Sequence, residues 1–163
     1  MLWQVVAQRG ISTPMKKRPP RSPTGRPAMA GALVFSLLET AEAVEAKLEA
    51  AVSPVGLSLA KLGIMHLLAE ANEPLPLSEL AKIQHCVRSN ITQLVDRLEK
   101  DGLVRRRADP ADRRSVLAEL TSAGEQAHAK GMRALAEAQR TIVSGLKAED
   151  AASLKSALSA LTS

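Results

Sequence analysis

The alternation of hydrophobic and polar positions predicts a mostly helical chain, in which one amphipathic helix is followed by a β-hairpin. In residues 87–101 four apolar positions recur at i, i+3, i+4 and i+7, namely Ile91, Leu94, Val95 and Leu98. The opposite face carries Ser89, Asn90, Gln93 and Arg97. Gly102 follows, and glycine tolerates the positive φ with which many helices end. The helix is therefore expected to pack on a core and to present its polar face outward.

A basic hairpin is predicted directly after this helix. Arginines 105–107 precede a turn at Ala108-Asp109-Pro110, and Arg113-Arg114 lie beyond the turn. Val116, Leu117 and Leu120 then predict a returning strand. A polar-faced helix followed by an arginine-edged hairpin is typical of a recognition helix and a wing that bind DNA.

Helical periodicity also predicts a long helix near the start of the chain, over residues 33–51. Its apolar stripe consists of Val34, Leu37, Leu38, Ala41, Val44, Leu48 and Ala51. Glutamates 39, 42, 45 and 49 line another face, and Ser53-Pro54 with Gly56 end the helix.

Two more helices are predicted before the recognition helix. Ser58 is placed to cap the first, Leu59–Ala71, which is apolar nearly all round and is therefore expected at the centre of the core. A short helix over Leu77–Ile83 and a turn over 84–87 follow. Helix, tight turn, helix and hairpin together predict a winged helix-turn-helix.

After the hairpin, Thr121 restarts the helical pattern. Small and apolar residues recur at three- and four-residue steps, namely Ala127, Gly131, Leu135, Ala138, Ile142 and Leu146. Residues 149–161 repeat the pattern with leucines 154, 158 and 161. These helices and the first one have apolar faces that a small central domain cannot cover, so a homodimer is expected. The predicted division is a tail over 1–28 and a domain over 29–163, with dimerisation helices at 33–52 and 121–161 and a winged helix-turn-helix at 57–120.

The tail, residues 1–28, contains five prolines among basic and hydroxylated residues, a composition typical of disorder. Its apolar part precedes its basic part, the reverse of a signal peptide. Three interpretations stay open: a basic arm that touches DNA phosphates, a solvated tail, or a true start at Met29.

The charge is unevenly distributed along the chain. The net charge is +5, but residues 1–28 hold six basic and no acidic residues, which leaves 16 basic and 17 acidic residues elsewhere. Residues 82–114 hold nine basic and five acidic residues, and residues 33–80 hold two and seven. Positive charge is thus concentrated on the predicted DNA-binding segment.

Composition excludes several other classes of protein. One cysteine rules out an internal disulfide and is consistent with the cytoplasm, where we expect the protein. No apolar run approaches the roughly 18 residues of a membrane span. His66, His85 and His128 lack metal-ligand spacing, so neither a metal nor another cofactor is expected. No phosphate-cradling glycine loop or triad pattern predicts an enzyme, and the arginine-rich wing argues against an adaptor that does not bind DNA.

With these elements in view, residues 33–161 resemble the MarR family of dimeric bacterial transcriptional regulators. The matching motifs are Ser89-Asn90-Ile91-Thr92, Leu94–Glu99, Asp101–Arg106, Asp109-Pro110-x-Asp112-Arg113-Arg114 and Leu120-Thr121-x-x-Gly124. The resemblance implies a mostly helical homodimer on a pseudo-palindromic operator, often released by a small ligand or an oxidant.

The residues expected to contact double-stranded DNA lie on the predicted recognition helix and the wing. They are Arg88, Ser89, Asn90, Thr92, Gln93 and Arg97 on the helix, and Arg106, Arg113 and Arg114 on the wing. The resemblance implies that Asp112-x-Arg114 orders the wing and sends Arg114 to the minor groove, with Asp109 as a turn residue. Asp96 would repel phosphate and is expected to hold an arginine in place instead.

Two positions depart from the family pattern. Gln84 stands where an apolar residue usually closes the first helix of the motif, and Val87 stands where Ser or Thr commonly caps the recognition helix.

Cys86 leaves two interpretations open. A redox switch would use a thiolate favoured by Arg88 and the adjoining helix end, whereas a structural cysteine would act as a small buried hydrophobe. The structural interpretation is preferred, because the peroxide-sensing members of the family carry their reactive cysteine in the first helix. No residue identifies an effector ligand.

Overall fold

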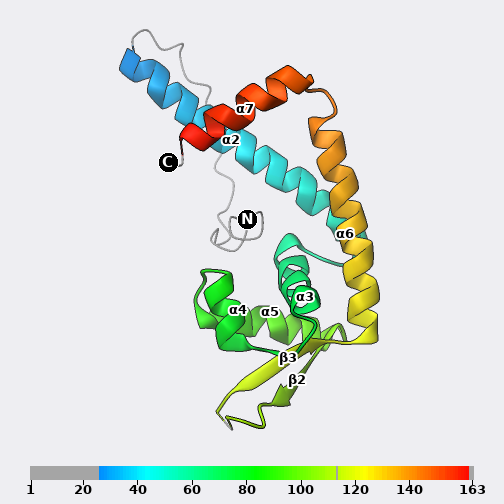
Figure 1. Cartoon of the computed structure of the whole chain (residues 1–163). Helices are drawn as coiled ribbons and strands as arrows, with labels where there is room; N and C mark the ends of the chain where they lie inside the picture. The colour runs from blue at the N-terminus through cyan, green and yellow to red at the C-terminus, as the bar shows by residue number, and fades with distance from the viewer. Residues whose placement is uncertain (1–25, 113, 162–163) are drawn as a thin grey trace.

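The computed structural model describes residues 26–112 and 114–161, in which helices flank a small sheet (Figure 1). The elements are α2 (Arg26–Val52), the 3-10 turn η1 (Ser53–Val55), α3 (Leu59–Ala71), β1 (Leu75–Pro76), α4 (Leu77–Ile83), α5 (Arg88–Lys100), β2 (Val104–Ala108), β3 (Val116–Leu120), α6 (Ser122–Val143) and α7 (Ala148–Ala160). The elements from α3 to β3 form a winged domain, and α2, α6 and α7 extend from it. The predicted fold class, mainly α with a β-hairpin wing and flanking helices, is confirmed.

The sheet is antiparallel, with the order β1-β3-β2. Strands β2 and β3 pair from Val104↔Leu120 to Ala108↔Val116 and form the predicted hairpin. Strand β1 adds a short edge opposite residues 117–118 of β3. It was not predicted, because two residues are too few to show a period.

Helix α3 lies at the centre of the core, as predicted. Leu62 and Met65 are completely inaccessible to solvent, and the helix packs against α5, α6 and β3. From α5, Ile91, Val95 and Leu98 are inaccessible as well. The predicted apolar face of α5 is therefore its buried face.

The start of α3 is stabilised by two side chains. The Ser58 hydroxyl accepts a hydrogen bond from the Lys61 N–H at 3.2 Å, the predicted cap. The Glu49 carboxylate of α2 accepts a second one from the Leu59 N–H at 2.8 Å. Because Glu49 belongs to another helix, this bond ties the end of α2 to the winged domain.

The N-terminal boundary of α2 differs from the prediction. The helix is described from Arg26, seven residues before the predicted start at residue 33, and it includes residues 26–28 of the expected tail. Pro27 is compatible with the first described turn of the helix, where a missing backbone N–H costs no intrahelical hydrogen bond. The rest of the expected tail, residues 1–25, lies outside the described residues.

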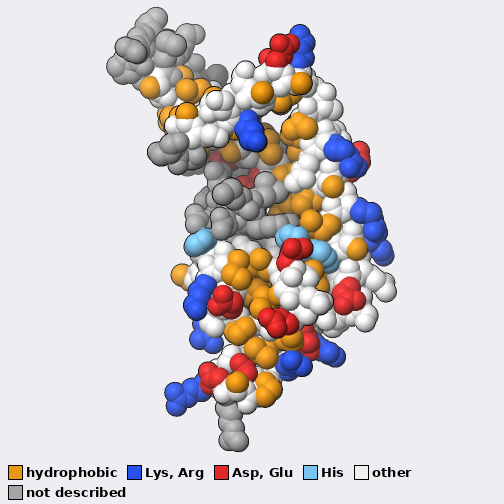
Figure 2. Space-filling view, viewed as in Figure 1, with side chains coloured by type: hydrophobic (Ala, Val, Ile, Leu, Met, Phe, Trp, Pro, Cys, Tyr) orange, Lys and Arg blue, Asp and Glu red, His pale blue; other side chains and the backbone are white. Residues whose placement is uncertain are grey.

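The outer helices expose large apolar side chains. Leu33 and Val34 of α2 are 57% and 54% exposed, and Leu154 and Leu158 of α7 are 45% and 43% exposed. In Figure 2, hydrophobic side chains gather at this outer end of the molecule as well as on the winged domain. Only the inner part of α2, around Val52, is buried in the core.

No single helix among the described residues has both the length and the apolar composition to cross a membrane. Residues 30–55 and α3 meet those criteria as a pair, but the chain bends by 73° between them.

Two glycines allow α6 to approach the winged domain closely. A Cβ atom at Gly124 would lie 2.0 Å from the Leu103 carbonyl oxygen, and one at Gly131 would lie 2.9 Å from leucine side chains. The Thr121 hydroxyl accepts a hydrogen bond from the Gly124 N–H at 3.0 Å and donates to the Gly102 carbonyl at 2.7 Å. The start of α6 is therefore fastened to the turn that follows α5.

We expect Gly124→Ala to lower the free energy of unfolding by about 2–3 kcal/mol, because the new methyl group would overlap a backbone atom. Gly31→Ala is the matched control, since Gly31 is also helical and a Cβ atom there would have no neighbour within 4 Å. Helix propensity should leave that variant unchanged or stabilise it by up to about 1 kcal/mol. Urea denaturation followed by circular dichroism measures both, and equal stabilities would contradict the role of Gly124.

Candidate nucleic-acid interface

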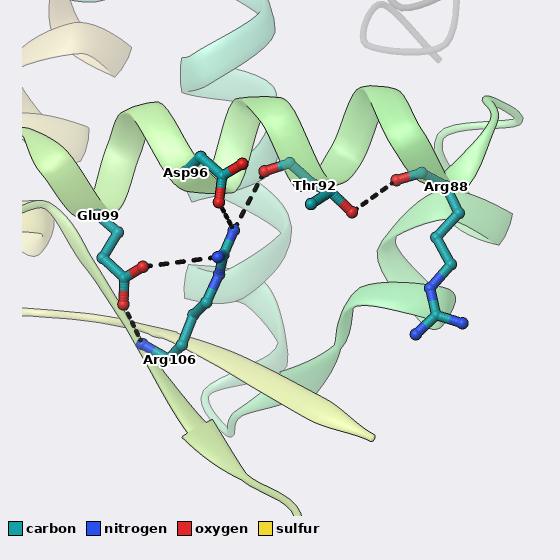
Figure 3. Close-up of polar contacts among 5 residues, drawn as sticks. All are labelled: Arg88, Thr92, Asp96, Glu99 and Arg106. Atoms are coloured by element: carbon teal, nitrogen blue, oxygen red, sulfur yellow. Dashed lines mark hydrogen bonds and ion pairs between the residues drawn. The ribbon is translucent and has the colours of Figure 1, made fainter. Parts of the chain in front are cut away.

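The polar face of α5 is exposed on the side away from the core. Its accessible side chains are Arg88, Ser89, Asn90, Gln93 and Arg97. Thr92 is half-buried, and its hydroxyl donates to the carbonyl of Arg88 at 3.0 Å, one turn earlier (Figure 3). Five of the six helix residues predicted to contact DNA are therefore open to a ligand, and the Thr92 hydroxyl is used by the helix itself.

The turn before α5 contains both departures from the family pattern. Val87 precedes the helix in an extended conformation and provides no side-chain cap, as predicted. Gln84 is only 4% exposed and so occupies the place of the expected apolar residue. His85 adopts a φ of 49°, which few residues other than glycine tolerate. The tight turn thus contains a buried amide and a strained backbone.

The loop at the tip of the wing is ordered by two aspartates. One Asp109 carboxylate oxygen accepts from the Ala111 N–H at 2.9 Å, and one Asp112 oxygen accepts from the Arg114 N–H at 2.9 Å. The Ser115 N–H donates to the Asp112 carbonyl at 2.8 Å. Asp112 therefore positions Arg114 through its backbone and leaves the guanidinium exposed.

Arg113, the other wing arginine expected to contact DNA, lies outside the described residues.

Arg106 of β2 turns toward α5 and not toward the tip of the wing (Figure 3). Its Nη2 pairs with the Asp96 carboxylate and donates to the Thr92 carbonyl at 3.1 Å. Its Nη1 lies 3.7 Å from a Glu99 oxygen, and its backbone N–H donates to the other Glu99 oxygen at 3.1 Å. The expectation that Asp96 holds an arginine is confirmed, and this arginine is one that was grouped with the DNA contacts.

Glu99 was missed in the sequence analysis. It lies three residues after Asp96, so both carboxylates share a stripe of α5 between the apolar face and the exposed polar face. Two acidic residues at this spacing, close to a predicted basic strand, could have indicated that both pair with an arginine of that strand.

The neighbouring arginine of β2 has a different partner. Arg105 Nε lies 2.6 Å from a Glu119 carboxylate oxygen on β3, and the two residues are opposite each other in the hairpin. This ion pair lies within the sheet and does not reach α5.

The single cysteine has the surroundings of a structural residue. Cys86 is half-buried against the core, and burial raises the pKa of its thiol. A raised pKa disfavours the thiolate, the form that reacts with peroxide and disulfides. The structure thus supports the preferred interpretation of Cys86.

Two of the three histidines meet between α3 and α6. The rings of His66 and His128 stack with centroids 5.6 Å apart. Burial, and then the proximity of His66, lowers the pKa of His128, while Glu70 acts in the opposite direction. Among the described residues, no group of three or more His, Cys, Asp or Glu side chains is arranged to hold a metal ion.

A pocket of about 270 Å³ opens beside His128, between α3, β3 and α6. Its charged lining is acidic, namely Glu73, Glu119 and Glu125. Because like charges repel, this lining is unfavourable for an anionic ligand.

A helix-turn-helix with an exposed polar helix and an ordered basic wing defines the class: this is a winged helix-turn-helix protein. Comparison with known proteins shows which proteins the winged domain is similar to. Residues 57–116 match the MarR family. The chain is 35% identical over 94 residues to the HTH-type transcriptional repressor YetL of Bacillus subtilis (strain 168), a match that covers 57% of this chain and 56% of that relative. The chain therefore spans little more than half of this relative's length.

Solved structures extend the similarity to the flanking helices. A "probable transcriptional regulator" from Pseudomonas aeruginosa is 26% identical, with a TM-score of 0.69 over 82% of this chain and 98% of that one. A mutant of MarR from E. coli, complexed with operator DNA, is 20% identical and has a TM-score of 0.70 over 85% and 99% of the two chains. The match to the MarR family thus covers residues 57–116, and the similarity of fold extends over the flanking helices.

The lowered pKa of His128 predicts a pH-dependent stability. The fold favours the neutral ring of His128. Its contribution to the free energy of unfolding is therefore intact above the ordinary pKa of 6.5, and it is lost as the pH falls from there toward the lowered pKa of the folded state. Between pH 7.5 and pH 5.5 we expect the native protein to lose more free energy of unfolding than His128→Gln, in which the titrating ring is gone. Denaturant titrations at the two pH values measure this, and equal losses would show that His128 contributes nothing.

Proposed function

We propose that the protein is a homodimeric repressor that binds a pseudo-palindromic operator in double-stranded DNA. The observation that carries this proposal is the exposed polar face of α5 beside an ordered wing whose Arg114 is exposed. An α-helix of this kind fits the major groove, where amide and hydroxyl groups can distinguish base edges.

The charges of the interface support the same assignment. Arg88 and Arg97 flank the short polar side chains of α5 and can neutralise phosphates on either side of the groove. A guanidinium suits the narrow, negative minor groove, so Arg114 is the residue we assign there. Arg113 keeps its predicted role as a second wing contact.

The relatives support binding to an operator. The Bacillus relative is named a transcriptional repressor, and the E. coli neighbour was crystallised with operator DNA. The first is 35% identical over 94 residues and the second has a similar fold over 85% of this chain, so we assign repression and operator binding to it as well.

The dimer is assigned to α2, α6 and α7. Leu33, Val34, Leu154 and Leu158 expose apolar surface that a second copy of the chain would bury. A two-fold dimer would present two copies of α5 to successive turns of the major groove, roughly 34–36 Å apart. An inverted repeat with that spacing is therefore the expected operator.

Release by a small ligand is a further part of the proposal, and it is supported only by the resemblance to the MarR family. The redox alternative through Cys86 is disfavoured by the raised pKa of its thiol. A cytoplasmic location follows from a DNA-bound function in bacteria and remains part of this proposal.

Arg114→Ala is expected to weaken specific DNA binding by about tenfold without changing stability, because it removes one groove contact. Lys147→Ala is the matched control, since Lys147 is exposed at the start of α7, far from the wing (Figure 1). Fluorescence anisotropy with an operator duplex selected from a random library measures both affinities. An unchanged affinity for Arg114→Ala would contradict the assigned wing contact, and a failure of the native protein to select any duplex would contradict the function.

Leu158→Glu is expected to produce a monomer, because it places a charge on an apolar surface assigned to the dimer. Ser156→Glu adds the same charge on the other side of α7 and should leave the dimer intact. Light scattering at micromolar concentration gives the mass of each variant. A native protein that is monomeric at that concentration would overturn the assigned dimer.

A further inference from the structure

Arg106 connects the two parts of the proposed interface. It joins β2 to α5 through polar contacts, and its partners Thr92, Asp96 and Glu99 lie along one stripe of that helix (Figure 3). The stripe borders the exposed face that carries Ser89, Gln93 and Arg97. A contact here is therefore placed to control how the wing is oriented against the recognition helix.

The guanidinium is engaged within the protein. Nη2 serves both Asp96 and Thr92, and Nη1 faces Glu99. Nε is buried, with no hydrogen-bond partner in the described part of the chain. Only 24% of the Arg106 side chain is exposed, against 69% for Arg105 on the same strand, so little of its surface is accessible to a DNA phosphate.

The position of Arg106 in the sheet explains why this contact matters. Arg106 is opposite Ala118, which also pairs with Leu75 of β1. The register of β1 ends one residue further on, at Leu117. Beyond that point, within the described residues, β2 and β3 pair only with each other in the sheet. Arg106 therefore fastens the hairpin to α5 close to the place where the sheet narrows to two strands.

We propose that Arg106 is a positioning residue: held by Asp96 and Glu99, it sets the angle between the recognition helix and the wing. That angle lets α5 and Arg114 engage adjacent grooves at the same time. The inference rests on the proposed DNA binding and assigns to Arg106 a role distinct from contact with DNA. It also explains why two carboxylates are tolerated beside a DNA-binding face, since Arg106 offsets their charge.

Asp96→Asn distinguishes this role from a direct contact with DNA, because the two roles predict opposite changes in DNA affinity. The substitution removes a negative charge beside the DNA and releases Arg106, so a phosphate-contacting Arg106 would bind DNA as tightly or more tightly. A positioning Arg106 would lose its anchor, and specific affinity should fall by about tenfold, the scale of a coupled charge contact. Unchanged or tighter binding by this variant would overturn the inference.

A double-mutant cycle with the wing tests the same point independently. If Arg106 positions the wing, Arg114→Ala should cost about tenfold in the native background and close to nothing in Arg106→Gln. Equal costs in the two backgrounds would overturn the inference. Arg105→Gln, which loses an ion pair within the sheet, is the control background and should leave the cost of Arg114→Ala at about tenfold.

Two measurements keep the inference distinct from folding and from the proposed function. All affinities are compared at a temperature where denaturant titration shows each variant fully folded. Arg106→Lys keeps the positive charge but loses the planar guanidinium that binds two partners at once, so it should behave like Arg106→Gln. Hydrogen exchange in the free protein should become faster in residues 105–108 and 115–118 in Asp96→Asn and in Arg106→Gln, but not in Arg105→Gln. This readout needs no DNA: unchanged exchange overturns the inference, whereas a native protein that binds no operator overturns only the proposed function.

Discussion

The structure depends on the burial of α3, a helix that is apolar nearly all round. Leu62 and Met65 are inaccessible because α5, α6 and β3 surround them. Burying a leucine or methionine side chain contributes about 1.5–3 kcal/mol, so this helix supplies much of the stability of the winged domain. Recognition helix, sheet and outgoing helix all take their positions from contacts with it. The polar face of α5 points outward because its apolar face packs against α3.

The arrangement also connects the winged domain to the helices assigned to the dimer. Glu49 of α2 holds the first turn of α3, and Thr121 with Gly124 holds α6 to the turn after α5. Both connections are short hydrogen bonds or backbone contacts and leave little freedom between the elements. A movement of α2 would therefore be transmitted to the start of α3, and a movement of α6 to the turn that follows α5.

Much of the fold could be predicted because local signals and burial agree. Helices α3 and α4 have the predicted bounds, since Ser58, Asn72 and the turn at 84–87 mark their ends. The prediction missed the first residues of α2, because the proline-rich composition of residues 1–28 indicated disorder, and it missed β1, which has only two residues. The positions of the exposed α5 residues followed from helical period alone.

The role of Arg106 could not be predicted in the same way. Its side chain is one of five arginines between positions 105 and 114, and composition cannot tell which of them turns inward. That choice depends on the register of β2 against β3 and on the distance from the hairpin to α5, both of which are tertiary. Asp96 was the clue, because an acid beside a DNA-binding face needs a basic partner, but only the folded chain identifies which one.

The two aspartates of the wing have a consequence for the cost of association. Each accepts its hydrogen bond from an N–H two residues further along the chain, so the loop is organised by its own sequence and needs no template. A loop that is already ordered loses little conformational entropy when it meets a ligand. The described residues of the wing tip are thus preorganised by hydrogen bonds within the loop, before any ligand is bound.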